Sequence, residues 1–152
     1  MRIVSVGVIR NSVKESKENG WGNVVSDIVI NKEYETALDK IEGFSHVIVI
    51  FWIGPATRAR RSVLKVHPRR RKDLPLVGVF AARSPSHPNP IGVTTVKILA
   101  RYSNVLRVIG LDAVDRTLVI DIKPYIPGYD SPGRAKTPPW LKKLRQTSLQ
   151  TP

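Results

Sequence analysis

Cysteine is absent from this 152-residue chain, which excludes disulfide bonds, thiolate zinc sites and a thiol nucleophile. No apolar run reaches the roughly 18 residues that a membrane-spanning helix needs, since the longest, Val47–Ile53, has the length of a strand. The first residues also lack the long apolar stretch and cleavage site of a signal peptide. The simplest expectation is a cytoplasmic protein with no membrane partner.

Two further kinds of site have little support in the sequence. Gly20-Trp21-Gly22 is the only Gly-x-Gly, and it lacks the third glycine of a dinucleotide-binding fingerprint. No histidine pair has metal-ligand spacing, because the three histidines are far apart in the chain: His46, His67 and His87. We therefore expect no metal site.

Acidic residues become scarce after residue 50. Residues 1–50 contain six Lys and Arg against seven Asp and Glu, whereas residues 51–152 contain nineteen against five. This division, together with a formal net charge of +13, is typical of a protein that binds a polyanion, most often nucleic acid. A basic surface without a specific partner is the alternative.

The densest basic stretch is Thr57–Lys72, TRARRSVLKVHPRRRK, with eight Lys and Arg and no acidic residue. Pro68 interrupts any helix there, because proline lacks the backbone N–H and clashes with the preceding turn. A solvated loop is one interpretation, but we favour a loop that contacts phosphates. The candidate substrate-binding residues are Arg58, Arg60, Arg61, Arg69, Arg70 and Arg71.

All twelve prolines lie at or after residue 55, so the later part of the chain is expected to contain short segments joined by rigid turns. Seven segments are rich in Val and Ile and bounded by Gly, Pro, Asn or Asp, as strands are. They are Ile3–Ile9, Val24–Ile30, His46–Ile53, Leu76–Ala82, Gly92–Leu99, Val105–Asp112 and Leu118–Ile122. We predict a mainly β fold, a small antiparallel β-barrel of about seven strands.

One or two short helices complete the prediction. Glu33–Ile41 presents apolar side chains on one face, and Gly43 follows where a C-terminal cap is expected. A second helix is expected to start near Thr137 and to contain Trp140–Leu144. We divide the chain into a barrel domain, residues 1–128, and a basic, proline-rich C-terminal extension, residues 129–152.

Two segments carry more specific signals. In Phe80–Val93, FAARSPSHPNPIGV, several prolines restrict the loop, and Arg83 follows an apolar strand. Its guanidinium suits a carboxylate or phosphate, although a structural turn with a surface ion pair is the alternative. In Asp121–Tyr125, DIKPY, Asp121 and Lys123 face the same side of a strand. They could hold opposite ends of a zwitterion or simply bind each other.

Together these motifs resemble the TrmO (TsaA-like, YaeB) family. The resemblance rests on RSP-x-x-PNPIG, followed by LDxxDxT and DIKPY, with GVIR at Gly7–Arg10 and GFSHVIVIFW at Gly43–Trp52 in support. It implies an S-adenosylmethionine-dependent tRNA methyltransferase of the β-barrel class that dimerises. The implied substrate is N6-threonylcarbamoyladenosine next to the anticodon. The implied cofactor contacts are Arg83, Val93, Asp121, Ile122, Lys123 and Pro124, and Asp121 is also a candidate base.

The sequence departs from the family pattern in four places. His87 stands where R-P-N-P has arginine, and Arg116 stands where D-G-T-P has glycine. Gly54 lies where a histidine is usual, and no Pro-Arg-Gln occurs within residues 14–23. Two alternatives to the implied tRNA methyltransferase therefore stay open. One is a non-catalytic RNA-binding barrel, and the other is methyl transfer to another RNA or small substrate.

Overall fold

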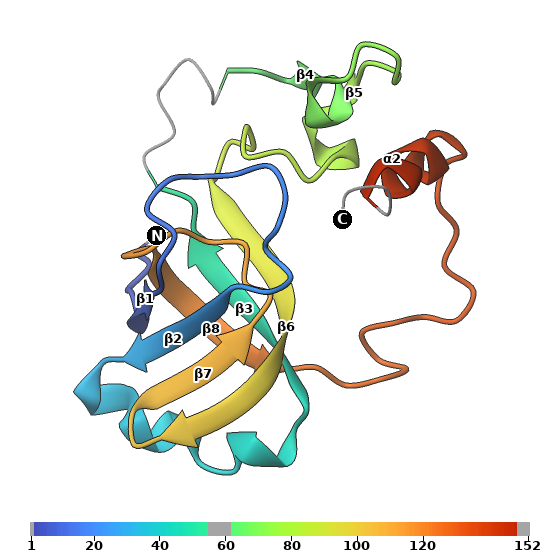
Figure 1. The fold of residues 1–152 in the computed structure, drawn as a ribbon. Coiled ribbons are helices and arrows are strands. Elements are labelled where there is room, and N and C mark those ends of the chain that lie inside the picture. Colours follow the sequence, from blue (N-terminus) through green and yellow to red (C-terminus); the bar gives the residue numbers. More distant parts are fainter. Residues whose placement is uncertain (1, 55–61, 149–152) are drawn as a thin grey trace. The chain divides into compact units, whose positions relative to one another are not determined.

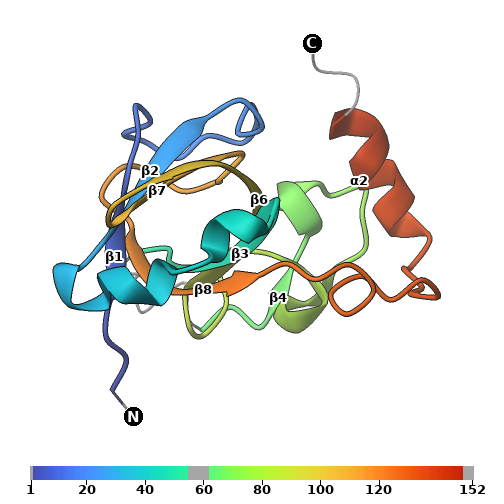
Figure 2. The ribbon, with the colours of Figure 1, turned by 90° about the horizontal axis from the view of Figure 1, so that it is seen from below.

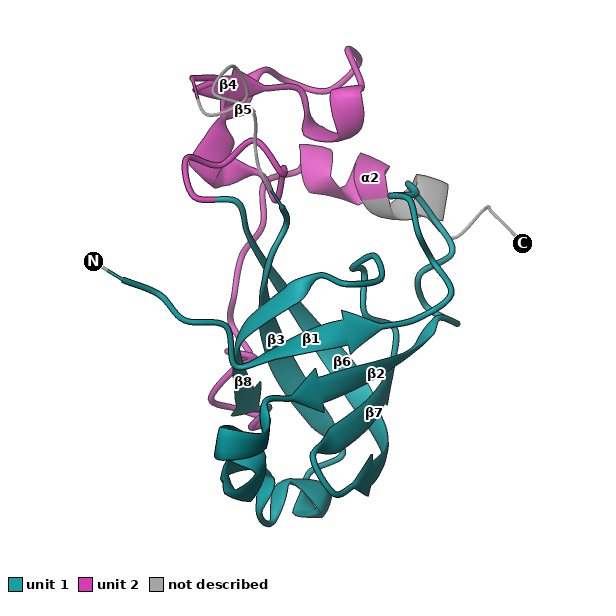
Figure 3. Ribbon diagram, turned by 90° about the vertical axis from the view of Figure 1, so that its left-hand side faces the viewer, with its two compact units in different colours: residues 1–55, 90–125 teal, residues 56–89, 126–152 magenta. Residues whose placement is uncertain are grey.

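The computed structural model describes residues 2–54 and 62–148, with side chains to residue 144. The chain forms two compact units (Figure 3). The first comprises residues 1–55 and 90–125, and the second comprises residues 56–89 and 126–152. The predicted extension therefore belongs to the second unit, together with the basic stretch and the Arg83 turn.

The first unit is a closed barrel of six antiparallel strands in the order β1-β2-β7-β6-β3-β8 (Figure 1). Figure 2 shows these strands arranged around the barrel from a second direction. Closure pairs every strand on both sides and leaves no exposed edge. The strands are β1 Gly7–Arg10, β2 Val25–Ile30, β3 His46–Trp52, β6 Ile91–Tyr102, β7 Val105–Ile109 and β8 Leu118–Pro124. The predicted mainly β barrel is confirmed.

The barrel core follows from strand alternation. In β3, Val47, Val49 and Phe51 point inward and are at most 4% exposed, whereas the residues between them are only partly buried. In β7, Leu106 and Val108 are fully buried, and Arg107 between them is exposed. This period of two places alternate side chains on opposite faces of the barrel wall.

One predicted strand is wrong. Only Val77–Gly78 of Leu76–Ala82 forms a strand, β5, and it pairs with β4, Lys65–Val66, in a separate two-stranded sheet. The chain then turns into a 3-10 helix, η4, Val79–Ala81. The physical reason is that six strands already close the barrel, so no edge remains to accept a seventh.

The predicted helix at Glu33–Ile41 is two 3-10 helices, η1 Lys32–Leu38 and η2 Ile41–Gly43. Asp39 is extended and Lys40 is left-handed, with φ 69°, so the helix cannot continue between them. Ion pairs from Arg101 to the two acids beside this break hold it in place, at 3.0 and 3.6 Å. Gly43 lies inside η2 rather than at a cap. The predicted apolar face is correct, because Leu38 is buried in the core.

The second unit contains β4, β5, η4, the 3-10 helix η3 at Pro68–Arg70 and the helix α2 at Trp140–Ser148. Helix α2 follows two prolines whose carbonyls accept the backbone N–H groups of Leu141 and Lys142, at 3.0 and 3.2 Å. The predicted C-terminal helix is therefore confirmed. In the barrel unit, a two-residue turn at Ser103 and Asn104 joins β6 to β7.

Candidate functional site

Strand β3 brings two of the predicted cofactor contacts into one row of the barrel. Val93 on β6 and Asp121 on β8 both pair with Ile50, from its opposite sides. Val93 is 42% exposed, and the Asp121 side chain is 43% exposed. The row therefore presents an apolar group and a carboxylate to solvent, from segments that are 28 positions apart in sequence.

Asp121 and Lys123 form an ion pair on β8. Lys123 Nζ lies 2.8 Å from Asp121 Oδ2, while Asp121 Oδ1 accepts the backbone N–H of Ile122, also at 2.8 Å. The hydrogen bond and charge of Asp121 raise the pKa of Lys123 above its ordinary value. The prediction that these side chains share one side of a strand is confirmed. Both charges remain accessible, because the Lys123 side chain is 61% exposed.

The other two residues of DIKP lie differently. Ile122 pairs with Val49 and packs against the core, so its side chain is turned away from the charged pair. Pro124 pairs with Val47 at the end of β8, and the next residue, Tyr125, donates its N–H to the His46 carbonyl at 3.1 Å. DIKP therefore supplies one exposed ion pair on a backbone that is fixed at both ends.

Arg83 lies in a turn of the second unit rather than at a strand end, because η4 replaces the expected strand. Its side chain is exposed. The turn is closed by His87, whose Nε2 lies 2.9 Å from the Ala82 carbonyl, and by Ser86, whose N–H donates to Ser84 Oγ at 3.2 Å. At the end of the loop Pro90 is fully buried, and its carbonyl accepts the Ile53 N–H at 2.8 Å. The prediction of a restricted loop agrees with these contacts.

The predicted phosphate-binding arginines have different environments. Arg58, Arg60 and Arg61 lie outside the described residues. Arg69 and Arg70 are exposed in η3, both with left-handed φ values, 51° and 55°. Arg71 binds both carboxylate oxygens of Asp73, at 3.0 and 2.6 Å. This pairing was missed because Asp73 lies one position beyond the basic stretch.

The second unit carries nearly all of the net charge. It contains fourteen Lys and Arg but only Asp73 and Asp130 as acids, whereas the barrel unit contains eleven Lys and Arg against ten acids. The second unit carries +12 on 61 residues, a higher charge density than the +14 on the 102 residues after residue 50. An excess of +12 on so few residues favours an electrostatic contact with a polyanion.

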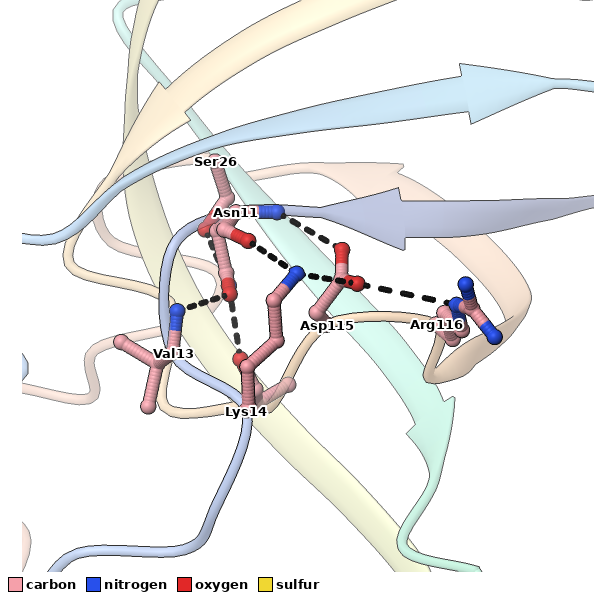
Figure 4. A network of polar contacts seen from close by, with 7 residues as sticks. Asn11, Val13, Lys14, Ser26, Asp115 and Arg116 are labelled. Atoms are coloured by element: carbon pink, nitrogen blue, oxygen red, sulfur yellow. Dashed lines mark hydrogen bonds and ion pairs between the residues drawn. The ribbon is translucent and has the colours of Figure 1, made fainter.

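A network of polar contacts joins the loop after β1 to the loop before β8 (Figure 4). One carboxylate oxygen of Asp115 accepts the Asn11 backbone N–H at 3.1 Å, and the other accepts the Lys14 ammonium at 2.7 Å. The Asn11 amide donates to buried Ser26 at 3.0 Å and accepts the Val13 N–H at 2.9 Å. The Asp115 side chain is 8% exposed, and the Lys14 hydrogen bond holds the pKa of its carboxyl below the usual value. These contacts fix the two loops to each other.

Sequence reasoning missed this network, although Asp115 was part of the LDxxDxT motif that carried the resemblance. No local pattern marks this network, because its two loops are far apart in the chain. Only the order of the antiparallel strands brings them to the same end of the barrel. Arg116, beside Asp115, has a left-handed φ of 66°. The family pattern has glycine at this position, the residue that adopts such a φ without a steric penalty.

A metal-ligand cluster and a membrane-spanning helix are both absent from the described part of the chain. Across residues 2–54 and 62–148, no three histidine or acidic side chains gather as they would around a metal ion. None of the helices in those ranges has the length and apolar character needed to cross a membrane.

Comparison with known proteins identifies the family. Residues 16–131 match the model described as the tRNA-methyltransferase O N-terminal domain. The chain therefore belongs to the tRNA-methyltransferase O family, as its motifs predicted. The fold agrees: a crystal structure of TrmO from Pseudomonas aeruginosa superposes with a TM-score of 0.70 at 25% identity, over 90% of this chain and 60% of that one.

Curated relatives include archaeal and mammalian proteins. A protein of Archaeoglobus fulgidus named "Probable S-adenosyl-L-methionine-binding protein" is 41% identical, over 99% of this chain and 41% of its own length. A Methanothermobacter thermautotrophicus protein of the same name is 41% identical, over 88% of this chain and 96% of its own length. The "tRNA (adenine(37)-N6)-methyltransferase" of Mus musculus is 40% identical, over 64% of this chain and 22% of its own length. The chain thus spans less than half of two of these relatives.

Proposed function

We propose that this chain is an S-adenosylmethionine-dependent tRNA methyltransferase that acts on N6 of N6-threonylcarbamoyladenosine next to the anticodon. The observation that carries the proposal is membership of the tRNA-methyltransferase O family over residues 16–131. The names of the archaeal relatives support the cofactor, and the name of the mouse relative supports the tRNA position and atom. Because the chain spans less than half the length of two of these relatives, the activity is a proposal for this chain and is not carried over from them.

The exposed ion pair fits the amino-acid end of the cofactor. That end carries an ammonium and a carboxylate, which match Asp121 and Lys123 respectively. The two side chains now bind each other at 2.8 Å, so a bound zwitterion would replace one ion pair with two. Val93, 42% exposed in the same row, offers an apolar surface beside them. Arg83, in the second unit, remains a predicted cofactor contact in its own right, because a guanidinium can bind both oxygens of a carboxylate.

The contacts of Asp121 favour a holding role over a base role. When bound, S-adenosylmethionine supplies a methyl group on a sulfonium, whose sulfur leaves as a neutral thioether. The accepting nitrogen must lose a proton around the transfer, and a nearby base would assist. Both oxygens of Asp121 already accept hydrogen bonds, from Ile122 and Lys123. Taking a proton would neutralise Asp121 and end its ionic interactions, whereas holding the cofactor's ammonium would keep its charge.

The decisive experiment measures transfer of a labelled methyl group to two tRNA preparations, with and without the threonylcarbamoyl group. We expect incorporation only into the modified tRNA. Incorporation into both would indicate a different RNA substrate. No incorporation by protein that binds the cofactor would indicate a non-catalytic RNA-binding barrel.

We also propose a homodimer, which light scattering would test through a mass twice that of one chain.

Variants of the ion pair test the site. Lys123→Gln and Asp121→Asn should each weaken S-adenosylmethionine binding in calorimetry, while Lys97→Gln, which changes an exposed barrel lysine on β6, should not. If Asp121 is instead the base, Asp121→Asn should lower kcat and leave cofactor affinity unchanged. Equal effects of Lys97→Gln and Lys123→Gln would contradict the assignment of this site.

A further inference from the structure

The 3-10 helix η4 holds an aromatic side chain out in solvent. Val79, at its start, is only 2% exposed and anchors the turn, whereas Phe80, the next residue, is 80% exposed. Single exposed apolar residues are common on protein surfaces, so exposure alone does not assign a role to Phe80. Its contact with a second ring and the charge of its unit are the observations that point to a partner.

The Phe80 ring is braced from one side. The His87 ring lies against it with centroids 5.7 Å apart and planes at 60°. His87 is itself fixed, because its Nε2 lies 2.9 Å from the Ala82 carbonyl. A carbonyl oxygen only accepts, so Nε2 carries the hydrogen and donates it. This contact orients the imidazole, which packs against one side of the Phe80 ring and leaves the rest of the ring open to a ligand.

The unit that contains Phe80 selects the class of partner. Its fourteen Lys and Arg against two acids attract a polyanion, and Arg69 and Arg70 are exposed on it. Proteins that bind single-stranded nucleic acid combine a positive surface with exposed aromatic rings on which bases stack. A duplex offers its phosphates but keeps its bases stacked on one another, so only unpaired nucleotides can use such a ring.

We propose that Phe80 is a stacking platform for an unpaired base of the RNA that this protein binds. The proposal rests on the proposed function, which makes RNA the partner, and adds the residue that distinguishes unpaired from paired nucleotides. The cations of the second unit supply affinity for any RNA. Phe80 adds affinity only where a base is free to lie on its ring.

Binding of two labelled RNAs, measured by fluorescence anisotropy, tests the proposal. One is a stem-loop with an unpaired loop, and the other is a blunt duplex with the same number of phosphates. Phe80→Ala should weaken stem-loop binding by about 5- to 150-fold, the range for loss of one stacked base. Duplex binding should change by less than about 2-fold, since phosphate contacts are untouched. Phe80→Trp should bind the stem-loop about as tightly as the wild type, because tryptophan also offers a ring for stacking.

The matched control is Tyr129→Ala, which removes an aromatic side chain of nearly equal exposure, 81%, from the same unit. It should leave both affinities near wild type. Equal losses for Phe80→Ala on stem-loop and duplex, or an equal loss for Tyr129→Ala, would overturn the proposal. So would loss of S-adenosylmethionine binding in Phe80→Ala, which would place the ring in the cofactor site.

The outcomes also separate this proposal from the proposed function. If the wild-type protein transfers methyl groups to tRNA but Phe80→Ala binds the stem-loop normally, only the stacking assignment is wrong. If the wild-type protein binds neither RNA, both are wrong. Melting curves of each variant verify the fold, which replacement of an 80% exposed side chain should not affect.

Discussion

Replacing Gly92 with alanine should destabilise the barrel through a collision with one side chain. Gly92 on β6 pairs directly with Phe51 on β3, and the Phe51 ring lies across the glycine. A Cβ added to Gly92 would meet two ring carbons of Phe51 at 2.4 Å. The backbone conformation of Gly92 is open to any residue, so the effect would be purely steric.

The expected size follows from the packing around Phe51. Carbon atoms in contact normally lie about 3.5–4.0 Å apart, so the ring would have to move by more than about 1 Å. Phe51 is 4% exposed and belongs to the core cluster, which leaves it no free space. Overpacking of this kind costs about 1–3 kcal/mol, which corresponds to a Tm lower by about 2–12 °C in a protein of this size.

The assay is equilibrium denaturation followed by tryptophan fluorescence, in a double-mutant cycle. Phe51→Ala alone should lower the free energy of unfolding by about 3–5 kcal/mol. In that background Gly92→Ala should have almost no effect, because the ring that it strikes is gone. The two changes would then be non-additive by about 1–3 kcal/mol, the sign of a direct contact.

Gly43→Ala provides the matched control. No atom lies within 4 Å of a Cβ added at Gly43, and its φ is not in the left-handed range. It should be neutral or slightly stabilising, because alanine restricts the unfolded chain more than glycine does. A Gly92→Ala protein as stable as Gly43→Ala, or additive effects in the cycle, would refute the steric argument.

Three further predictions concern the loops. Asp115→Asn should make the free energy of unfolding fall less steeply as the pH is lowered. The pKa of Asp115 is lowered in the folded protein, so its stabilisation is present above the ordinary aspartate pKa of about 3.9 and is lost as pH falls through the lowered value. Unfolding curves between pH 6 and about pH 2 that match those of the wild type would contradict this. Arg116→Gly should raise the free energy of unfolding by about 0.5–1 kcal/mol, because glycine fits the left-handed φ of 66°, and a less stable variant in chemical denaturation would count against it. Arg69→Gly with Arg70→Gly should lower RNA affinity and reduce the slope of log affinity against log salt by about 0.7–0.9 per lost phosphate contact, without destabilising the fold, since both residues have left-handed φ values; an unchanged slope would exclude them from the RNA surface.

Local patterns were enough to predict most of the barrel. Runs rich in Val and Ile and bounded by Gly, Pro, Asn or Asp located the barrel strands β3, β6 and β7 to within a few residues. The spacing of Asp121 and Lys123 on β8 likewise predicted that they share a side, and they form an ion pair at 2.8 Å. These features depend on neighbours in the chain, which the sequence lists in order.

Features that depend on distant neighbours were missed. Leu76–Ala82 has the composition of a strand, but barrel closure leaves it no partner, and it forms η4 instead. The expected helix at Glu33–Ile41 is broken where Arg101, from another strand, pairs with Asp39 at 3.0 Å. Propensity cannot anticipate either result, because the competing interaction lies elsewhere in the fold.

Gly92, the glycine of PNPIG, shows the difference between what local sequence and tertiary contacts explain. As a motif residue it contributed to the family resemblance, but nothing local explains why it must be glycine. The explanation is the Phe51 ring on the neighbouring strand, which follows only from the β3–β6 register. The sequence by itself determined the family, the barrel class and the charged strand β8. The tertiary structure alone decided which side chains meet, because strand order and register bring together residues that are far apart in the chain.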